Sequence, residues 1–207
     1  MKPDKFLSAE ERERVRAAIA AAELKTAGEI RVLVVGRSTP RPFLLALIVG
    51  AVFAFTSYFR FLTSWAWNHP GLLEVFVAAA IGLFGAVIIA WFAPPTRKEK
   101  KRAVWDRAGR EFTRLGIGKT AGATGVLVML SLWEQHAVVL ADKAINEKVA
   151  PDTWASHVKV LVDGVKAGRP GEGIAAAVAE IGALLATHFP RRDDDVNELP
   201  DDVESRK

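Results

Sequence analysis

The sequence predicts an α/β protein, a three-layer α/β/α sandwich with a small mixed sheet, interrupted by a two-helix transmembrane hairpin. Two long apolar runs, residues 43–62 and 72–92, lie close together in the first half of the chain. Segments with helical and strand-like hydrophobic patterns alternate on either side of them. Half of the residues are hydrophobic and a quarter are charged, so the polar residues are concentrated outside the two runs.

The two apolar runs have the length of membrane-spanning helices. A hydrocarbon core about 30 Å thick needs about 20 residues at a rise of about 1.5 Å each. Arg60 is the only charged residue of the first run, and Glu74 is the only one of the second. The alternative is a buried helical pair in a large core, but the rest of the chain is too short to cover two helices that are apolar all round.

Positive charge flanks the predicted hairpin on one side only. Three arginines precede it within residues 31–41, and six Lys and Arg follow it within 97–107, whereas the loop 63–71 contains none. The positive-inside rule then predicts a two-pass protein of a bacterial-type inner (plasma) membrane, with both termini cytoplasmic and the lipid bilayer as a partner. The same basic cluster explains most of the net charge of +4, and the chain lacks a nucleic-acid-binding motif, so no nucleic acid partner is expected.

The remaining sequence is predicted to form one discontinuous domain. Residues 1–42 and 94–189 together make a cytoplasmic α/β domain around the hairpin 43–93, and residues 190–207 form an acidic tail. A capping box at Ser8 predicts the start of the first helix. The expected elements in chain order are helix 9–22, strand 29–35, helix 98–115, strands 125–132 and 136–141, and helices 153–167 and 174–187.

Motifs for known enzyme chemistry are incomplete. Residues 118–120 resemble the end of a phosphate-binding P-loop, but Thr113 replaces the first glycine, and the order of helix and strand is reversed. The four histidines have no metal-ligand spacing, and the absence of cysteine excludes disulfides, thiolate catalysis and Cys-ligated metals. No catalytic residue is assigned, and whether the chain is an enzyme stays open.

The predicted topology brings two carboxylates to one edge of the sheet. The first two strands are joined through a helix and should be parallel, and the third should return antiparallel. Glu29 at the start of the first strand and Asp142 at the end of the third then lie at the same edge, with Thr124 beside them. These oxygens suit a hard cation such as Ca²⁺ or Mg²⁺, which could hold phosphate. Alternatively, both carboxylates are solvated or cap strand ends.

The acidic tail contains one distinctive segment. It is formed by Asn197, Glu198, Leu199, Pro200 and Asp201 within an otherwise polar stretch. The composition favours a solvated end. The order of these five residues favours a short docking segment for another protein.

Several short motifs together resemble the TPM domain family, which includes thylakoid-lumen and photosystem II proteins and auxiliary proteins of nematode receptors. Residues 23–30 are similar to the family pattern E-x-x-T-x-G-E-I, and residues 197–201 read N-E-L-P-D. Weaker matches are residues 120–127 and Phe189-Pro190. The resemblance covers essentially the whole chain outside the hairpin.

The resemblance implies an α/β/α sandwich with an acidic cleft. Some members of the family act as acid phosphatases or bind divalent cations, and others are partners of membrane complexes. Carried over to this chain, Glu29 and Asp142 match the acidic cleft. The leading expectation is an inner-membrane-anchored, TPM-like protein-interaction module that depends on a divalent ion, its partner another membrane or peripheral protein. The alternative is a metal-assisted phosphatase for phosphomonoesters, with a metal-bound water as nucleophile.

Overall fold

The computed structural model of the chain describes residues 3–39, 95–150, 152–191 and 197–206, together with Val77, Ala80 and Phe84. The chain divides into two compact units. One consists of Met1–Thr39 and Arg97–Lys207, and the other is Pro40–Thr96. Val77, Ala80 and Phe84 are helical. The fold and site described below belong to the first unit, which we call the α/β unit.

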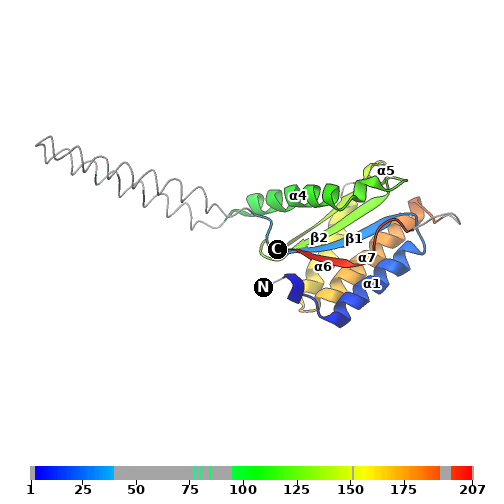
Figure 1. The fold of residues 1–207 in the computed structure, drawn as a ribbon, viewed down its shortest axis with the longest axis horizontal. Helices are drawn as coiled ribbons and strands as arrows, with labels where there is room; N and C mark the ends of the chain where they lie inside the picture. Colours follow the sequence, from blue (N-terminus) through cyan, green and yellow to red (C-terminus); the bar gives the residue numbers. More distant parts are fainter. Residues whose placement is uncertain are drawn as a thin grey trace, which may run out of the picture. The chain divides into compact units, whose positions relative to one another are not determined.

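The α/β unit is built on a four-stranded mixed sheet in the order β3-β2-β1-β4 (Figure 1). β1 pairs in parallel with both β2 and β4, and β2 pairs antiparallel with β3. Both central strands are buried along their whole length, in keeping with their nearly continuous apolar sequences. The strands are β1 (Glu29–Val35), β2 (Gly125–Ser131), β3 (His136–Ala141) and β4 (Val203–Arg206).

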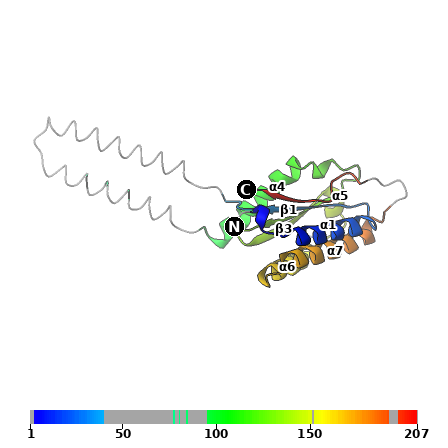
Figure 2. The same ribbon diagram turned by 60° about the horizontal axis from the view of Figure 1, so that its bottom comes forward.

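Helices cover both faces of the sheet (Figure 2). The larger apolar core lies between the sheet and α1, α6 and α7, and a smaller one lies between the sheet and α4. The α-helices are α1 (Ala9–Glu23), α4 (Arg97–Arg114), α5 (Lys143–Asn146), α6 (Thr153–Lys166) and α7 (Pro170–His188), and short 3-10 turns are η1 (Pro3–Lys5) and η2 (Ile117–Lys119).

The first helix begins as its sequence predicts. Ser8 Oγ accepts a hydrogen bond from the Glu11 backbone N–H at 3.2 Å, and Glu11 Oε2 accepts one from the Ser8 N–H at 2.9 Å. This reciprocal capping satisfies two of the N–H groups that a helix start leaves without helical partners. Val15 and Ile19 on the buried face of α1 then pack in the larger core.

The mixed α/β class is confirmed, with four strands and five α-helices in the described part of the chain. The parallel pairing of β1 with β2 and the antiparallel β2–β3 hairpin both follow the predicted topology. The sequence did not predict β4, which lies in the acidic tail. Its four residues include one buried apolar side chain, Val203, so hydrophobic alternation gives almost no signal there.

The membrane assignment is corrected. Within the described residues, no helix is long and apolar enough to cross a membrane. Of the longer described helices, α4 is rich in charged residues, and the apolar residues of α7 pack in the larger core. The predicted spans 43–62 and 72–92 fall almost entirely outside the described residues. The hairpin, the two-pass inner-membrane localisation and the cytoplasmic termini therefore have no support in this structure.

Candidate functional site

A pocket of about 260 Å³ lies where α1 ends and β1 begins. It joins the two motifs that the sequence singled out separately, the E-x-x-T-x-G-E-I segment and the N-E-L-P-D segment of the tail. We call it the carboxylate pocket. It is lined by Ala20, Glu23, Leu24, Thr26, Glu29, Arg191, Asn197 and Asp201.

Glu23 is the most perturbed ionisable group of this pocket. Its side chain is almost buried, with 8% of the residue exposed. Oε1 accepts a hydrogen bond from the Ile30 N–H at 3.0 Å, and Oε2 accepts one from Asn197 Nδ2 at 3.3 Å. Burial, together with the nearby charges of Glu29 and Asp201, raises the pKa of Glu23 to about 8 against the opposing effect of the Ile30 hydrogen bond. At neutral pH the carboxyl group is therefore largely protonated, so it can donate a hydrogen bond to Asp201.

The turn between α1 and β1 is fixed by Thr26 and Gly28. Thr26 Oγ1 donates a hydrogen bond to the Phe189 carbonyl at 2.6 Å and accepts one from the Gly28 N–H at 3.1 Å. A Cβ atom on Gly28 would lie 2.8 Å from Cδ1 of the buried Leu185, so a side chain at this position would require Leu185 to shift. These contacts give the T-x-G part of the motif a structural reason, since they place Glu29 at the start of the strand.

Glu29 binds the main chain of the tail. Its residue is 6% exposed, and its carboxylate accepts hydrogen bonds from the N–H groups of Glu198 at 3.1 Å and Leu199 at 3.2 Å. The Glu198 carboxylate in turn accepts from the Ala121 N–H at 3.1 Å, and Leu199 packs against the smaller core. The N-E-L-P-D segment is therefore bound to its own domain.

Two arginines bind the tail further along. Arg31, 7% exposed in β1, donates a hydrogen bond to the Pro200 carbonyl, and its guanidinium lies 3.5 Å from the Glu204 carboxylate. Arg12 on α1 donates to the Val203 carbonyl at 3.2 Å and to the Ser205 hydroxyl at 2.9 Å. We call the surface formed by Arg12, Glu29, Arg31 and Ala121, which receives residues 197–206, the tail groove.

The predicted metal ligands have other partners in the structure. Asp142 Oδ1 accepts a hydrogen bond from the Lys143 N–H at 2.6 Å and caps α5, whereas Thr124 Oγ1 donates to the Ala27 carbonyl at 2.8 Å. Asp142 Oδ2 is buried and has no hydrogen-bond partner among the described residues. Glu29 and Asp142 occupy one row across the sheet, since Glu29 pairs with Gly125 and the Asp142 N–H donates to the Gly125 carbonyl.

That row separates the two predicted ligands by one strand. Neighbouring strands lie about 4.8 Å apart, so the Cα atoms of Glu29 and Asp142 are roughly 10 Å apart. In the described part of the chain, no group of three or more His, Asp or Glu side chains is placed to hold a metal ion. Coordination of Ca²⁺ or Mg²⁺ by Glu29, Asp142 and Thr124 therefore stays a prediction.

Glu23, Arg12 and Arg31 were missed as site residues. Arg31 did leave a signal, because a charged residue in the middle of a buried strand needs a specific partner. Glu23 stands in the quoted motif, but nothing in its spacing predicts that the tail would cover it. The contacts of Arg12 join residues 193 positions apart, which no local pattern predicts.

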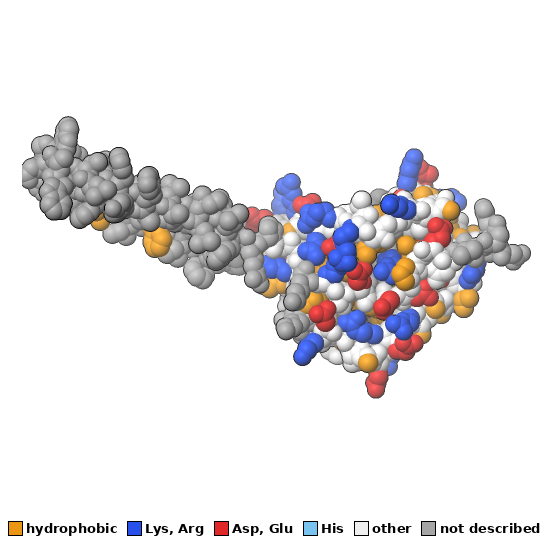
Figure 3. Space-filling view, in the orientation of Figure 1, with side chains coloured by type: hydrophobic (Ala, Val, Ile, Leu, Met, Phe, Trp, Pro, Cys, Tyr) orange, Lys and Arg blue, Asp and Glu red, His pale blue; other side chains and the backbone are white. Residues whose placement is uncertain are grey.

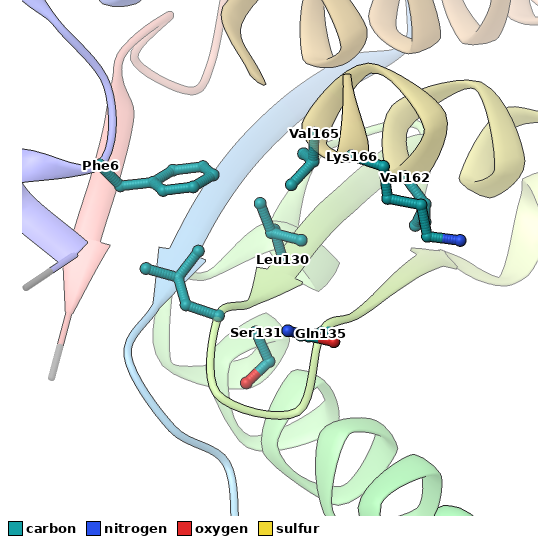
Figure 4. Close-up of a pocket in the computed structure, with 8 residues that line it drawn as sticks. Phe6, Leu130, Ser131, Gln135, Val162, Val165 and Lys166 are labelled. Carbon is teal, nitrogen blue, oxygen red and sulfur yellow. The ribbon is translucent and has the colours of Figure 1, made fainter. Parts of the chain in front are cut away.

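A second pocket, about 300 Å³ in volume, lies at the other end of β2 (Figure 4). Phe6 points towards Leu130 and Val165 across it. Its lining is mostly apolar, and none of the predicted site residues contributes to it. The carboxylate pocket and the tail groove are therefore the candidate functional site.

Comparison with known proteins defines the class of protein through its fold. No protein-family model matches the chain, and no curated protein sequence matches it. The chain is similar in structure to the BA42 protein of the psychrophilic bacterium Bizionia argentinensis, solved by NMR, with a TM-score of 0.62 and 23% sequence identity. The similarity covers 99% of this chain and 98% of BA42. At this identity the likeness shows a shared α/β fold alone.

Proposed function

We propose that the chain is a TPM-like domain with a three-layer α/β/α architecture that acts as a protein-interaction module. Its binding site is the tail groove together with the carboxylate pocket. One observation carries this proposal. Side chains of the domain bind the main chain of an extended segment at the N–H groups of residues 198 and 199 and at the carbonyls of residues 200 and 203.

Recognition of the main chain is typical of peptide-binding sites. Such contacts hold an extended segment whatever its side chains, and pockets for alternate side chains then add selectivity. Here Leu199 occupies an apolar position, and Glu204 lies between Arg31 and Arg114 at 3.5 and 3.6 Å. The tail also adds β4 to the edge of β1, which is the geometry of strand addition. A domain that binds its own tail in this way has the contacts needed to bind a segment of another protein.

The role of a divalent ion remains a secondary part of the proposal. Glu29 and Asp201 bring carboxylates to the carboxylate pocket, but Glu23 there is largely protonated and Arg191 also lines it, so the ion is proposed from the sequence and not from this lining. The metal-assisted phosphatase was the alternative expected from the sequence. No observation among the described residues favours it, so we place the protein-interaction role first.

Site-specific photocrosslinking in cells would test the proposal. Leu24 lines the carboxylate pocket and is 69% exposed, so a photoreactive residue there should crosslink to a bound partner. The matched control places the same probe at Trp133, 40% exposed, in the turn between β2 and β3. We expect discrete crosslinked proteins from position 24 that disappear when Glu29→Gln is added. The same proteins at both positions, or none at position 24, would contradict the proposal.

A further inference from the structure

We propose that residues 197–206 are a displaceable occupant of the tail groove, and that they give way to an extended acidic segment of another protein. The incoming segment would replace β4 as the parallel neighbour of β1. This inference rests on the proposed function, to which it adds the chemistry of the partner and a means of regulation.

The charge of the groove selects an acidic occupant. Arg12 and Arg31 belong to it, and Arg114, which is also paired with Glu111, lies beside it. The tail residue Glu204 lies within 3.6 Å of both Arg31 and Arg114, in addition to its ion pair with Arg206 of the tail itself. At the rim, Asp202 lies 3.2 Å from Arg16. Figure 3 shows basic and acidic side chains interspersed over this face of the α/β unit. A basic segment would place like charges beside these arginines, whereas an acidic one would pair with them.

The tail is held by contacts that a second segment can reproduce. Within the described residues, β4 pairs with residues 32–35 of β1, from Val32 opposite Val203 to Val35 opposite Arg206. Its buried apolar anchor is Val203, with Leu199 partly buried upstream. The rim ion pair between Arg16 and Asp202 is about half exposed on both sides and contributes little. The hydrogen bonds to tail main-chain atoms are ones that every extended segment offers, whereas Asn197, Glu198 and Ser205 add side-chain contacts that a partner would have to match.

Covalent attachment gives the tail its advantage over a separate segment. A tethered segment competes at an effective concentration of about millimolar, so it masks the groove against weaker binders. A partner must therefore either bind with higher affinity or meet a chain whose tail has been loosened. Weakening the tail without changing the groove should consequently uncover binding of an external peptide.

Reversing the charge of one tail residue in the full-length chain weakens binding of the tail without changing the tail groove. The variant Glu204→Lys faces Arg31 and Arg114 with a like charge, and the groove residues themselves stay unchanged. The probe is a fluorescently labelled decapeptide with the sequence of residues 197–206, measured by fluorescence anisotropy. We expect it to bind the E204K chain at least about tenfold more tightly than the wild-type chain, because the tethered competitor is weakened.

Two controls make the outcome specific. Asp202→Asn removes only the rim ion pair, so peptide affinity should stay as in wild type. The decapeptide carrying E204K should bind the E204K chain at least about tenfold more weakly than the native decapeptide, since it meets the same arginines. Circular dichroism checks that the variant is folded, and Leu199→Ala provides a second way of loosening the tail if E204K does not fold.

Equal affinity of the native decapeptide for folded wild-type, E204K and L199A chains would overturn the inference. Equal binding of the native and E204K decapeptides would also overturn it, since the groove would then show no preference for acidic segments. A concentration-dependent dimer of the wild-type chain, with no peptide binding to the variants, would show that a second copy is the occupant and overturn the inference. Crosslinking at position 24 tests the proposed function separately, because it can identify a partner even where the decapeptide fails.

Discussion

The wild-type chain should lose stability as the pH rises from about 5 to 8, because of Glu23. Replacing Glu23 by Gln should abolish this pH dependence. Burial raises the pKa of Glu23 to about 8 in the folded protein, against an ordinary value of 4.5. Between these two values the folded state binds more protons than the unfolded state, so the free energy of unfolding falls as the pH rises. The favourable contribution is complete below about pH 4.5 and is lost as the pH passes about 8.

The structure bounds the size of this effect. A pKa raised from 4.5 to about 8 corresponds to an upper limit of about 5 kcal/mol. Rearrangement of the Asn197 and Asp201 side chains when Glu23 ionises would reduce this limit, so we expect about 2 kcal/mol across this pH interval. Gln at this position keeps an acceptor for the Ile30 N–H and cannot ionise.

Urea unfolding at pH 5, 6, 7, 8 and 9 would measure the effect for both chains. The matched control is Glu13→Gln, because the Glu13 side chain on the same helix is 68% exposed. We expect the E13Q chain to follow the wild-type pH profile and the E23Q chain to be flatter by about 2 kcal/mol. Parallel wild-type and E23Q profiles would refute the argument that Glu23 is held protonated by its surroundings.

Three further predictions concern stability and ligands. Glu134→Ala should lower the free energy of unfolding by about 3 kcal/mol in urea, because this buried carboxylate accepts hydrogen bonds from two main-chain N–H groups just after β1; an unchanged midpoint would contradict it. Gly28→Ala should cost about 1–3 kcal/mol in the same assay, since its Cβ would meet Leu185 at 2.8 Å, and a loss below 0.5 kcal/mol would show that Leu185 moves aside at little cost. If Ca²⁺ or Mg²⁺ binds as the sequence predicts, it should raise the thermal midpoint of the wild-type chain relative to EDTA, and the rise should vanish in both Glu29→Gln and Asp142→Asn; no shift in any of the three would remove the ion from the proposal.

The sequence predicts those parts of the fold that are encoded locally. β1 and β2 are recognisable because a buried parallel strand needs a nearly continuous apolar run. The capping box of α1 is equally local, since Ser8 and Glu11 lie one helical turn apart. By contrast, β4 depends on side chains from distant parts of the chain. Arg31 contacts Glu204 of β4 and Arg12 contacts Val203, which lies 191 positions away, so no window of neighbouring residues predicts it.

The candidate site was predicted in separate pieces. Glu29 was expected to lie at the same sheet edge as Asp142, and the N-E-L-P-D segment was expected either to be solvated or to dock on another protein. The predicted strand order correctly placed Glu29 and Asp142 in one row across the sheet. It could not predict that two N–H groups of the tail would donate hydrogen bonds to the Glu29 carboxylate. The surface of the domain itself explains why residues 197–201 are distinctive. Asn197 at one end donates to Glu23, and the Pro200 carbonyl near the other end accepts from Arg31.

The carboxylate pocket and the tail groove are one coupled system, because tail residues complete the pocket. Asn197 donates to Glu23, and Asp201 contributes to the raised pKa of Glu23. Departure of the tail would admit water to Glu23 and remove the charge of Asp201, and these two changes lower the pKa of Glu23 by more than loss of the long Asn197 hydrogen bond raises it. Coupling between two sites is reciprocal, so if a closed tail favours the protonated Glu23, then protonation of Glu23 favours the closed tail. An alkaline shift should therefore loosen the tail in the same direction as the charge reversal at Glu204.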